Sequence, residues 1–210
     1  LANIKSQEII KSSAINNLLK IQSHRGPDAK KHLILDNLIF VHNRLKIIDL
    51  SNKANQPFVS KKTGNVIIFN GEIYNFKKLR KLLGHEKLET SSDTEILLRM
   101  YEKFNENFVN KLNGIFSFVI YDKRKKIIYS ARDRFGIKPL LLYYDGKRIV
   151  YSTEIKPILK IMKKKEINLN KIKNYISSGL LYDNNQTFFK NVNFQPPASY
   201  FKFSLNSFKF

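Results

Sequence analysis

Apolar side chains recur along the chain at helical spacing in some stretches and in short continuous runs in others. Between Ile10 and Ile21 an apolar residue occurs every three to four positions, which predicts a helix over residues 7–22 with one face on a core. The same reasoning predicts helices at residues 76–82, 94–104, 155–162 and 169–178. Ser92, with Glu95 three residues later, predicts a capping box at the start of the helix at 94–104.

Runs of apolar and β-branched residues between these helices predict strands. One hairpin is predicted over residues 33–41 with its turn at Asp36-Asn37, and another joins 140–144 to 148–153 through Asp145-Gly146. Further strands are predicted at residues 66–69, 115–121 and 127–131. Because no long connection of the kind that joins parallel strands is evident, the order of elements predicts an α+β fold with antiparallel sheets.

Composition excludes several classes of function. The 210 residues, 42% of them hydrophobic, can bury one sizeable core. The net charge of +21 comes mostly from lysine, and arginine, the residue suited to bidentate phosphate and base contacts, is scarce. We therefore expect no specific nucleic-acid partner, and a basic polyanion-binding protein remains the less favoured alternative.

No apolar run reaches 18 residues and the first residues do not resemble a signal peptide, so we expect a cytoplasmic protein with no membrane partner. The chain contains no cysteine, which excludes disulfides, and its four histidines show no metal-ligand spacing, so no metal site is predicted.

The hexapeptide Asn-Gly-Glu-Ile-Tyr-Asn at residues 70–75 is the strongest candidate for chemistry. It follows the apolar run 66–69, so the strand is expected to end where amide donors and a carboxylate begin. The backbone N–H of Gly71 and the carboxamide of Asn70 could both donate to one developing oxyanion, as acyl transfer requires. The alternative is an Asn-Gly β-turn between two strands.

Four other segments stand in order around this hexapeptide: residues 24–28, 44–49, 92–95 and 131–140. Together the five motifs resemble the glutaminase domain of asparagine synthetases, a class II glutamine amidotransferase of the N-terminal-nucleophile type. The resemblance runs from about His24 to Lys156 and continues more weakly to Tyr200. It implies a four-layer α/β/β/α sandwich of two antiparallel sheets, with residues 1–203 forming the amidotransferase domain and 204–210 leading toward a synthetase domain. Ala198 stands where the family usually has glycine.

The resemblance assigns Arg44 to the α-carboxylate of L-glutamine, which its planar guanidinium could grip through both oxygens. It places the backbone of the four following residues along the same pocket: Leu45, Lys46, Ile47 and Ile48. The alternative for Arg44 is a surface ion pair.

Asp93 matches the family carboxylate that meets the α-ammonium of glutamine, and Glu72 lies beside the same group. Capping of the following helix is the alternative for Asp93, and the two roles could coexist. Asn70 and the N–H of Gly71 would form the oxyanion hole. The motif at 132–139 and the loop at 24–28 are expected to set loop geometry rather than take part in chemistry.

The family's nucleophile has no counterpart in this chain. It is an N-terminal cysteine whose own α-amine serves as the base, and an amine pKa of about 8 suits that task. Residues 1–4 read like the sequence that follows a family Cys-Gly-Ile-Ala-Gly start, so we expect that part of the first strand and the cysteine are missing and that the fragment is inactive. The alternative is a catalytically dead glutamine-binding regulatory module.

In an intact parent, the resemblance implies asparagine synthesis with ammonia released from glutamine, with ATP and Mg²⁺ held by the covalently linked synthetase domain rather than by these residues. The sequence is compatible with a homodimer but does not establish one.

Overall fold

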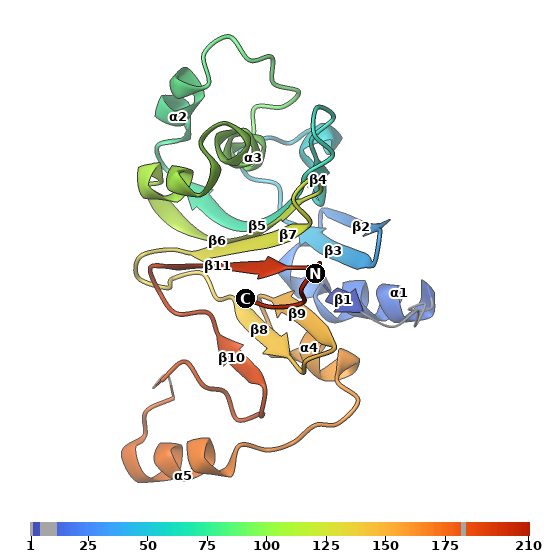
Figure 1. Cartoon of the computed structure of the whole chain (residues 1–210), viewed down its shortest axis with the longest axis vertical. Helices are drawn as coiled ribbons and strands as arrows, with labels where there is room; N and C mark the ends of the chain where they lie inside the picture. The colour runs from blue at the N-terminus through green and yellow to red at the C-terminus, as the bar shows by residue number, and fades with distance from the viewer. Residues whose placement is uncertain (1, 5–11, 182–183) are drawn as a thin grey trace.

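The computed structural model describes residues 2–4, 12–181 and 184–210. These residues form two antiparallel sheets that lie face to face, with helices on the outer face of each sheet (Figure 1). Every strand pair is antiparallel, which confirms the prediction of an α+β fold with antiparallel sheets.

The first sheet has six strands. In spatial order they are β10 (Val192–Phe194), β8 (Leu141–Tyr144), β9 (Arg148–Ser152), β1 (Ala2–Ile4), β3 (Leu38–Arg44) and β2 (Ala29–Leu35). The second sheet has five strands. Their order is β11 (Ser199–Ser204), β7 (Ile127–Arg132), β6 (Gly114–Asp122), β5 (Val66–Ile73) and β4 (Phe58–Val59).

The helices divide between the two outer faces (Figure 1). On the six-stranded sheet lie α1 (Ser12–Ile21) and α4 (Ile155–Ile161), and on the five-stranded sheet lie α2 (Phe76–Leu82) and α3 (Asp93–Phe104). Helix α5 (Leu169–Ser178) lies at the far end of the molecule. Short 3₁₀ turns complete the described elements: η1 (Ser23–Arg25), η2 (Asn52–Ala54) and η3 (Asn105–Lys111).

The core between the sheets follows from strand alternation. Leu38 and Phe40 of β3 point toward the five-stranded sheet and pack with Val119 and Tyr121 of β6. Burying each such side chain contributes about 1.5–3 kcal/mol. Because residues at every second position share a face, His42 and Arg44 continue this inward face of β3 beyond the apolar part of the core.

Local predictions are confirmed with some changes of boundary. The Asp36-Asn37 hairpin has the expected register, with Leu35 opposite Leu38. Helix α1 begins at Ser12 and ends at Ile21, and the predicted residues 7–11 lie outside the described part of the chain. None of the described helices is long and apolar enough to span a bilayer.

Candidate functional site

A cavity of about 370 Å³ opens where the inward face of β3 meets β5 and the start of α3. All of the predicted site residues except Lys46 line it: Arg44, Leu45, Ile47, Ile48, Asn70, Gly71, Glu72 and Asp93. Lys46 instead donates its backbone N–H to the Asp28 carboxylate at 2.8 Å and its ammonium to Asn52 Oδ1 at 3.1 Å. The fold therefore brings the predicted site residues of three separate sequence motifs to one concave surface, and His24, Arg25 and Lys138 of the other two motifs also line it.

Strand β5 does not end at Asn70 but runs on to Ile73, paired with β6 throughout. The expected strand end and the alternative Asn-Gly turn are therefore both wrong. Gly71 is required by close packing, because a Cβ there would lie 2.2 Å from the Ile115 carbonyl oxygen and 2.7 Å from Phe116 Cα. The N–H of Phe116 donates to the Asp133 carboxylate, and the carbonyl of Phe116 accepts from the backbone N–H of Asp133. The N–H of Gly71, opposite Phe116, consequently points away from β6.

Substituting Gly71 with alanine is expected to destabilise the domain by about 1–3 kcal/mol or more, since backbone atoms rather than a flexible side chain must move. Chemical denaturation followed by circular dichroism measures this loss. Gly84→Ala is a matched control, because Gly84 also has a positive φ but a Cβ there would meet nothing within 4 Å. An equal loss in both variants would contradict the packing explanation.

Asn70 presents an unsatisfied donor to the cavity. Its Nδ2 atom is buried and has no hydrogen-bond partner among the described residues. Leaving a buried amide donor unpaired costs about 1–3 kcal/mol. A hydrogen bond to an acceptor on a ligand would offset that cost. Asn70 and Gly71 are adjacent on β5, and both line the cavity.

Arg44 is buried, and three neutral acceptors hold its guanidinium. Nη1 donates to the Ser51 carbonyl at 2.8 Å and to Asn55 Oδ1 at 2.9 Å, and Nη2 donates to the Asp49 carbonyl. These contacts exclude the alternative of a surface ion pair. Within the described part of the chain, two of its five N–H groups remain for a ligand, which suits a carboxylate.

Nearby carboxylates help to keep the guanidinium of Arg44 protonated. Burial lowers the pKa of the guanidinium, while the carboxylates of Asp49, Asp28 and Asp93 oppose that change. Burial also raises the pKa of Asp49, but hydrogen bonds from Ser51 and Ser91 outweigh burial and hold that pKa at about 2. Asp49 thereby ties the loop after β3 to the loop before α3.

Asp93 occupies the first position of α3, where its Oδ2 accepts from the Ile73 N–H at 3.2 Å. Burial and the nearby Glu72 raise the pKa of Asp93, backbone hydrogen bonds only partly offset them, and the resulting pKa is about 6. Among the described residues Asp93 forms no direct ion pair, although the guanidinium of Arg44 is near enough to interact with it electrostatically. Capping and ligand binding are compatible here, because one oxygen meets the backbone and the cavity adjoins the same side chain.

The predicted capping box is only half formed. Ser92 Oγ accepts from the Glu95 N–H at 3.3 Å, as expected. The Glu95 carboxylate does not return to Ser92 but accepts from the N–H groups of Glu89 and Thr90 at 2.7–3.1 Å. Glu95 therefore anchors the loop that leads to Asp93.

The other two motifs make many structural hydrogen bonds. Asp133 accepts four backbone N–H groups, from Phe116, Phe135, Ile137 and Lys138, and these hold its pKa below the usual range although burial raises it. Arg132 donates to the carbonyls of Lys138, Gln195 and Gly136. In the loop at 24–28, His24 Nε2 lies 2.8 Å from Glu154 Oε1, and the Asp28 carboxylate accepts from the backbone N–H of Lys46.

Gln56 and His42 are polar residues of the cavity wall that sequence reasoning missed. Gln56 accepts from the Phe69 N–H at 2.6 Å and donates to Thr94 Oγ1 at 3.3 Å, so it links β5 to α3. His42 lies on the inward face of β3, two residues before Arg44, and burial lowers its pKa to about 4. Its place directly after the predicted hairpin at 33–41, two residues before Arg44, was a usable signal for His42, whereas nothing local distinguished Gln56.

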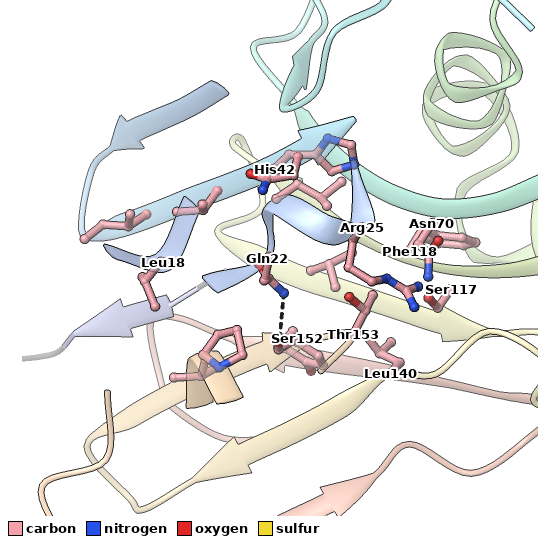
Figure 2. Close-up of a pocket in the computed structure, with 18 of the residues that line it drawn as sticks. Leu18, Gln22, Arg25, His42, Asn70, Ser117, Phe118, Leu140, Ser152 and Thr153 are labelled. Atoms are coloured by element: carbon pink, nitrogen blue, oxygen red, sulfur yellow. Dashed lines mark hydrogen bonds between the residues drawn. The ribbon is translucent and has the colours of Figure 1, made fainter. Parts of the chain in front are cut away.

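A second cavity of about 130 Å³ adjoins the first (Figure 2). It lies between β3 and β9 and shares Arg25, His42, Asn43 and Asn70 with the larger cavity. Across it Gln22 Nε2 donates to Ser152 Oγ at 3.5 Å. Among the described residues, no group of three His, Cys, Asp or Glu side chains could hold a metal ion.

One cavity is thus lined by Asn70 and Gly71, a buried arginine and a buried carboxylate. The sequence profile of the family described as "Glutamine amidotransferase domain" matches residues 1–209, and the chain belongs to that family. The resemblance found from the five motifs is thereby confirmed.

The relatives in this family include asparagine synthetases. The second glutamine-hydrolysing asparagine synthetase ascribed to Methanocaldococcus jannaschii is 35% identical over 196 residues, which cover 83% of this chain and 38% of that protein. Asparagine synthetase 3 of Bacillus subtilis is 36% identical over 162 residues, covering 75% of this chain and 26% of that protein. The chain thus spans well under half the length of these curated relatives.

Among solved structures, the glutamine phosphoribosylpyrophosphate amidotransferase from B. subtilis aligns with a TM-score of 0.49 at 23% identity, covering 58% of this chain and 28% of that chain.

Proposed function

We propose that this chain is the glutamine-binding unit of an amidotransferase of the asparagine synthetase type, with the N-terminal-nucleophile fold. In an intact parent it would hydrolyse L-glutamine to glutamate and ammonia for a linked, ATP- and Mg²⁺-dependent synthetase domain. The observation that carries the proposal is the shared cavity of Arg44, Asp93, Asn70 and Gly71. Each handle of glutamine finds a complementary group there.

Arg44 offers two N–H groups to the α-carboxylate, and Asp93 with Glu72 offers negative charge to the α-ammonium. Asn70 Nδ2 and the Gly71 N–H suit the oxygen of the side-chain amide, where negative charge develops during acyl transfer. Leu45, Ile47 and Ile48 complete the wall.

The position of the missing nucleophile is supported by strand register. Ala2 lies opposite Ile39 of β3 and Val150 of β9, and Asn3 lies opposite Leu38. A continuation of β1 upstream in this register would pass Phe40 and approach His42, along the second cavity between β3 and β9. We propose that an N-terminal cysteine in a longer parent reaches the amide site by this route. A glutamine-binding module without catalysis is the second candidate, supported by the cysteine-free sequence.

The experiment that tests the proposal is calorimetric titration of the chain with L-glutamine and D-glutamine. The L enantiomer is expected to bind more tightly, because exchanging the α-ammonium and the α-hydrogen moves the ammonium away from Asp93 while Arg44 holds the carboxylate. Equal heats for both enantiomers, or none for either, would contradict the proposal.

Affinity for L-glutamine is also expected to depend on pH. The pKa of Asp93 in the free site is about 6, so the carboxyl is increasingly protonated at lower pH and cannot attract an ammonium. Binding should therefore strengthen up to tenfold per unit as the pH rises toward 6, and level off near 7. The stability of the ligand-free domain changes in the opposite direction. Because folding raises the pKa of this carboxyl above its unfolded value, the free energy of unfolding decreases as the pH rises through 6.

Titrations at pH 5, 6, 7 and 7.5 measure this dependence. Asp93→Asn is the matched control, since it keeps the shape of the side chain but carries no titrating proton. It should bind weakly, with the pH dependence between 5 and 7 largely removed. The same pH profile in Asp93→Asn and the unmodified chain would exclude Asp93 as its cause.

A further inference from the structure

Asp49 is a buried carboxylate of the cavity wall that the proposed function leaves without a role. It is 7% exposed and lines the larger cavity. Its backbone belongs to the loop after β3, close to Arg44, and its side chain reaches the loop before α3, which leads to Asp93. Asp49 therefore lies between the two groups proposed to hold the carboxylate and the ammonium of glutamine.

One oxygen of Asp49 shapes the loop that holds Arg44. Oδ1 accepts from the backbone N–H of Ser51, two residues further on, at 2.8 Å, which is the hydrogen bond of an Asx turn. The backbone carbonyls of Asp49 and Ser51 both accept from the Arg44 guanidinium. The turn therefore presents two of the three acceptors that hold Arg44 in place.

The other oxygen ties this loop to the segment before Asp93. Oδ2 accepts from the backbone N–H of Ser91 at 2.9 Å and from the Ser91 hydroxyl at 3.1 Å. Ser91 is followed by the Ser92 cap and by Asp93, the first residue of α3. Among the described residues, no other hydrogen bond or ion pair joins residues 45–52 to residues 89–93. The Asp49 carboxylate is thus the polar link between the two loops.

The charge of Asp49 strengthens this link. Hydrogen bonds to an ionised acceptor are about twice as strong as hydrogen bonds between neutral groups. The hydrogen bonds from Ser51 and Ser91 hold the pKa of Asp49 at about 2, so the carboxyl is ionised at pH 7. The link between the loops therefore has its full strength under the conditions in which glutamine binding is measured.

We propose that Asp49 is a positioning residue that holds Arg44 and Asp93 at the separation required by the α-carboxylate and the α-ammonium of L-glutamine. The inference rests on the proposed function. A ligand that uses both groups gains from their fixed spacing, because the two loops need not be ordered when it binds. A ligand that uses Arg44 alone does not gain from it. Glutaramate, which is glutamine without its α-ammonium, is such a ligand.

Two substitutions weaken the link and leave the turn at Arg44 in place. In Asp49→Asn the remaining oxygen can still accept from the Ser51 N–H, whereas the NH₂ group that replaces Oδ2 cannot accept from Ser91. Ser91→Ala removes the hydroxyl bond to Oδ2 and leaves the negative charge of Asp49 unchanged.

Asp122→Asn is the matched control for the loss of a buried carboxylate. Asp122 is 6% exposed and lines neither of the two cavities. Like Asp49, it accepts from a nearby backbone N–H, that of Lys125 at 2.9 Å, and from a hydroxyl distant in the sequence, that of Tyr101 at 3.1 Å.

The experiment is calorimetric titration of the unmodified chain and the three variants with L-glutamine and with glutaramate at pH 7, with melting temperatures measured in parallel. In Asp49→Asn the affinity for L-glutamine should fall about tenfold, while the affinity for glutaramate should change less than about twofold. In Ser91→Ala the affinity for L-glutamine should fall about threefold, because one of the two hydrogen bonds remains. Asp122→Asn should bind both ligands as the unmodified chain does, whatever its melting temperature.

Equal losses for both ligands in Asp49→Asn would overturn the inference, because a general disturbance of the cavity has that effect. Tighter binding of both ligands would also overturn it, since removing a negative charge near Arg44 would then be the cause. If Asp49→Asn does not fold, Ser91→Ala decides the question, and an unchanged ratio of the two affinities in that variant rejects the role of Asp49. If the unmodified chain binds no L-glutamine, the proposed function is overturned together with it.

Discussion

Adding a Cys-Gly-Ile-Ala-Gly start before Leu1, with the cysteine as the first residue, is expected to produce glutaminase turnover, whereas the chain without this segment is expected to release no ammonia from glutamine. The thiolate would attack the amide carbon, the carbon–nitrogen bond would break, and the nitrogen would leave as ammonia with the proton held by the α-amine. Water would then hydrolyse the thioester to glutamate. The residues proposed as oxyanion donors and substrate clamps line the cavity, so the thiol and its amine are the parts that the added segment supplies.

Ammonia release measured with a coupled assay gives the result. Serine in place of the added cysteine should leave the protein nearly inactive, because a hydroxyl is a much poorer nucleophile near neutral pH. In the cysteine-initiated chain, Asn70→Ala should lower kcat by about 10²–10³-fold, the usual effect of removing one oxyanion donor. If the folded, cysteine-initiated chain bound L-glutamine and released no ammonia, the glutamine-binding regulatory module would be the better explanation.

The sequence predicted the structure best where a feature depends on residues that are close together in the chain. The hairpin at Asp36-Asn37 and the Ser92 cap depend on residues close together in the chain, and both form. The Asn-Gly pair at residues 70–71 illustrates the opposite case. Its turn preference is local, but pairing with β6 over the whole of β5 overrides it, and the reason for glycine is the approach of Ile115, a residue 44 positions away.

Long-range contacts also explain what the sequence did not reveal about the site. Lys46 falls in a motif that lines the cavity, yet Asp28 and Asn52 draw it away from that wall. Gln56 joins β5 to α3 through two hydrogen bonds that no spacing pattern encodes. The motifs therefore identified which segments meet, while the direction of each side chain depended on partners distant in the sequence.

Arg44→Ala is expected to weaken binding of L-glutamine by about 1.5–3 kcal/mol, a loss of roughly 10- to 150-fold in affinity. The hydrogen bonds of buried Arg44 go to neutral acceptors, so two of its N–H groups are left for an anionic ligand, although nearby carboxylates also act on its charge. Arg44→Lys should recover part of the affinity, because it keeps a charge but loses the planar pair of donors.

Calorimetry at pH 7 measures these affinities, with melting temperatures to verify that each variant folds, since Arg44 also holds the carbonyls of Ser51 and Asp49. Lys46→Ala is the matched control. It also removes a positive charge, two residues from Arg44, but the Lys46 side chain does not line the cavity. Affinity should therefore fall in Arg44→Ala and remain within about twofold in Lys46→Ala, because an exposed charge acts weakly through solvent. Equal losses in the two variants would mean that general positive charge attracts the ligand, and the clamp assigned to Arg44 would have to be abandoned.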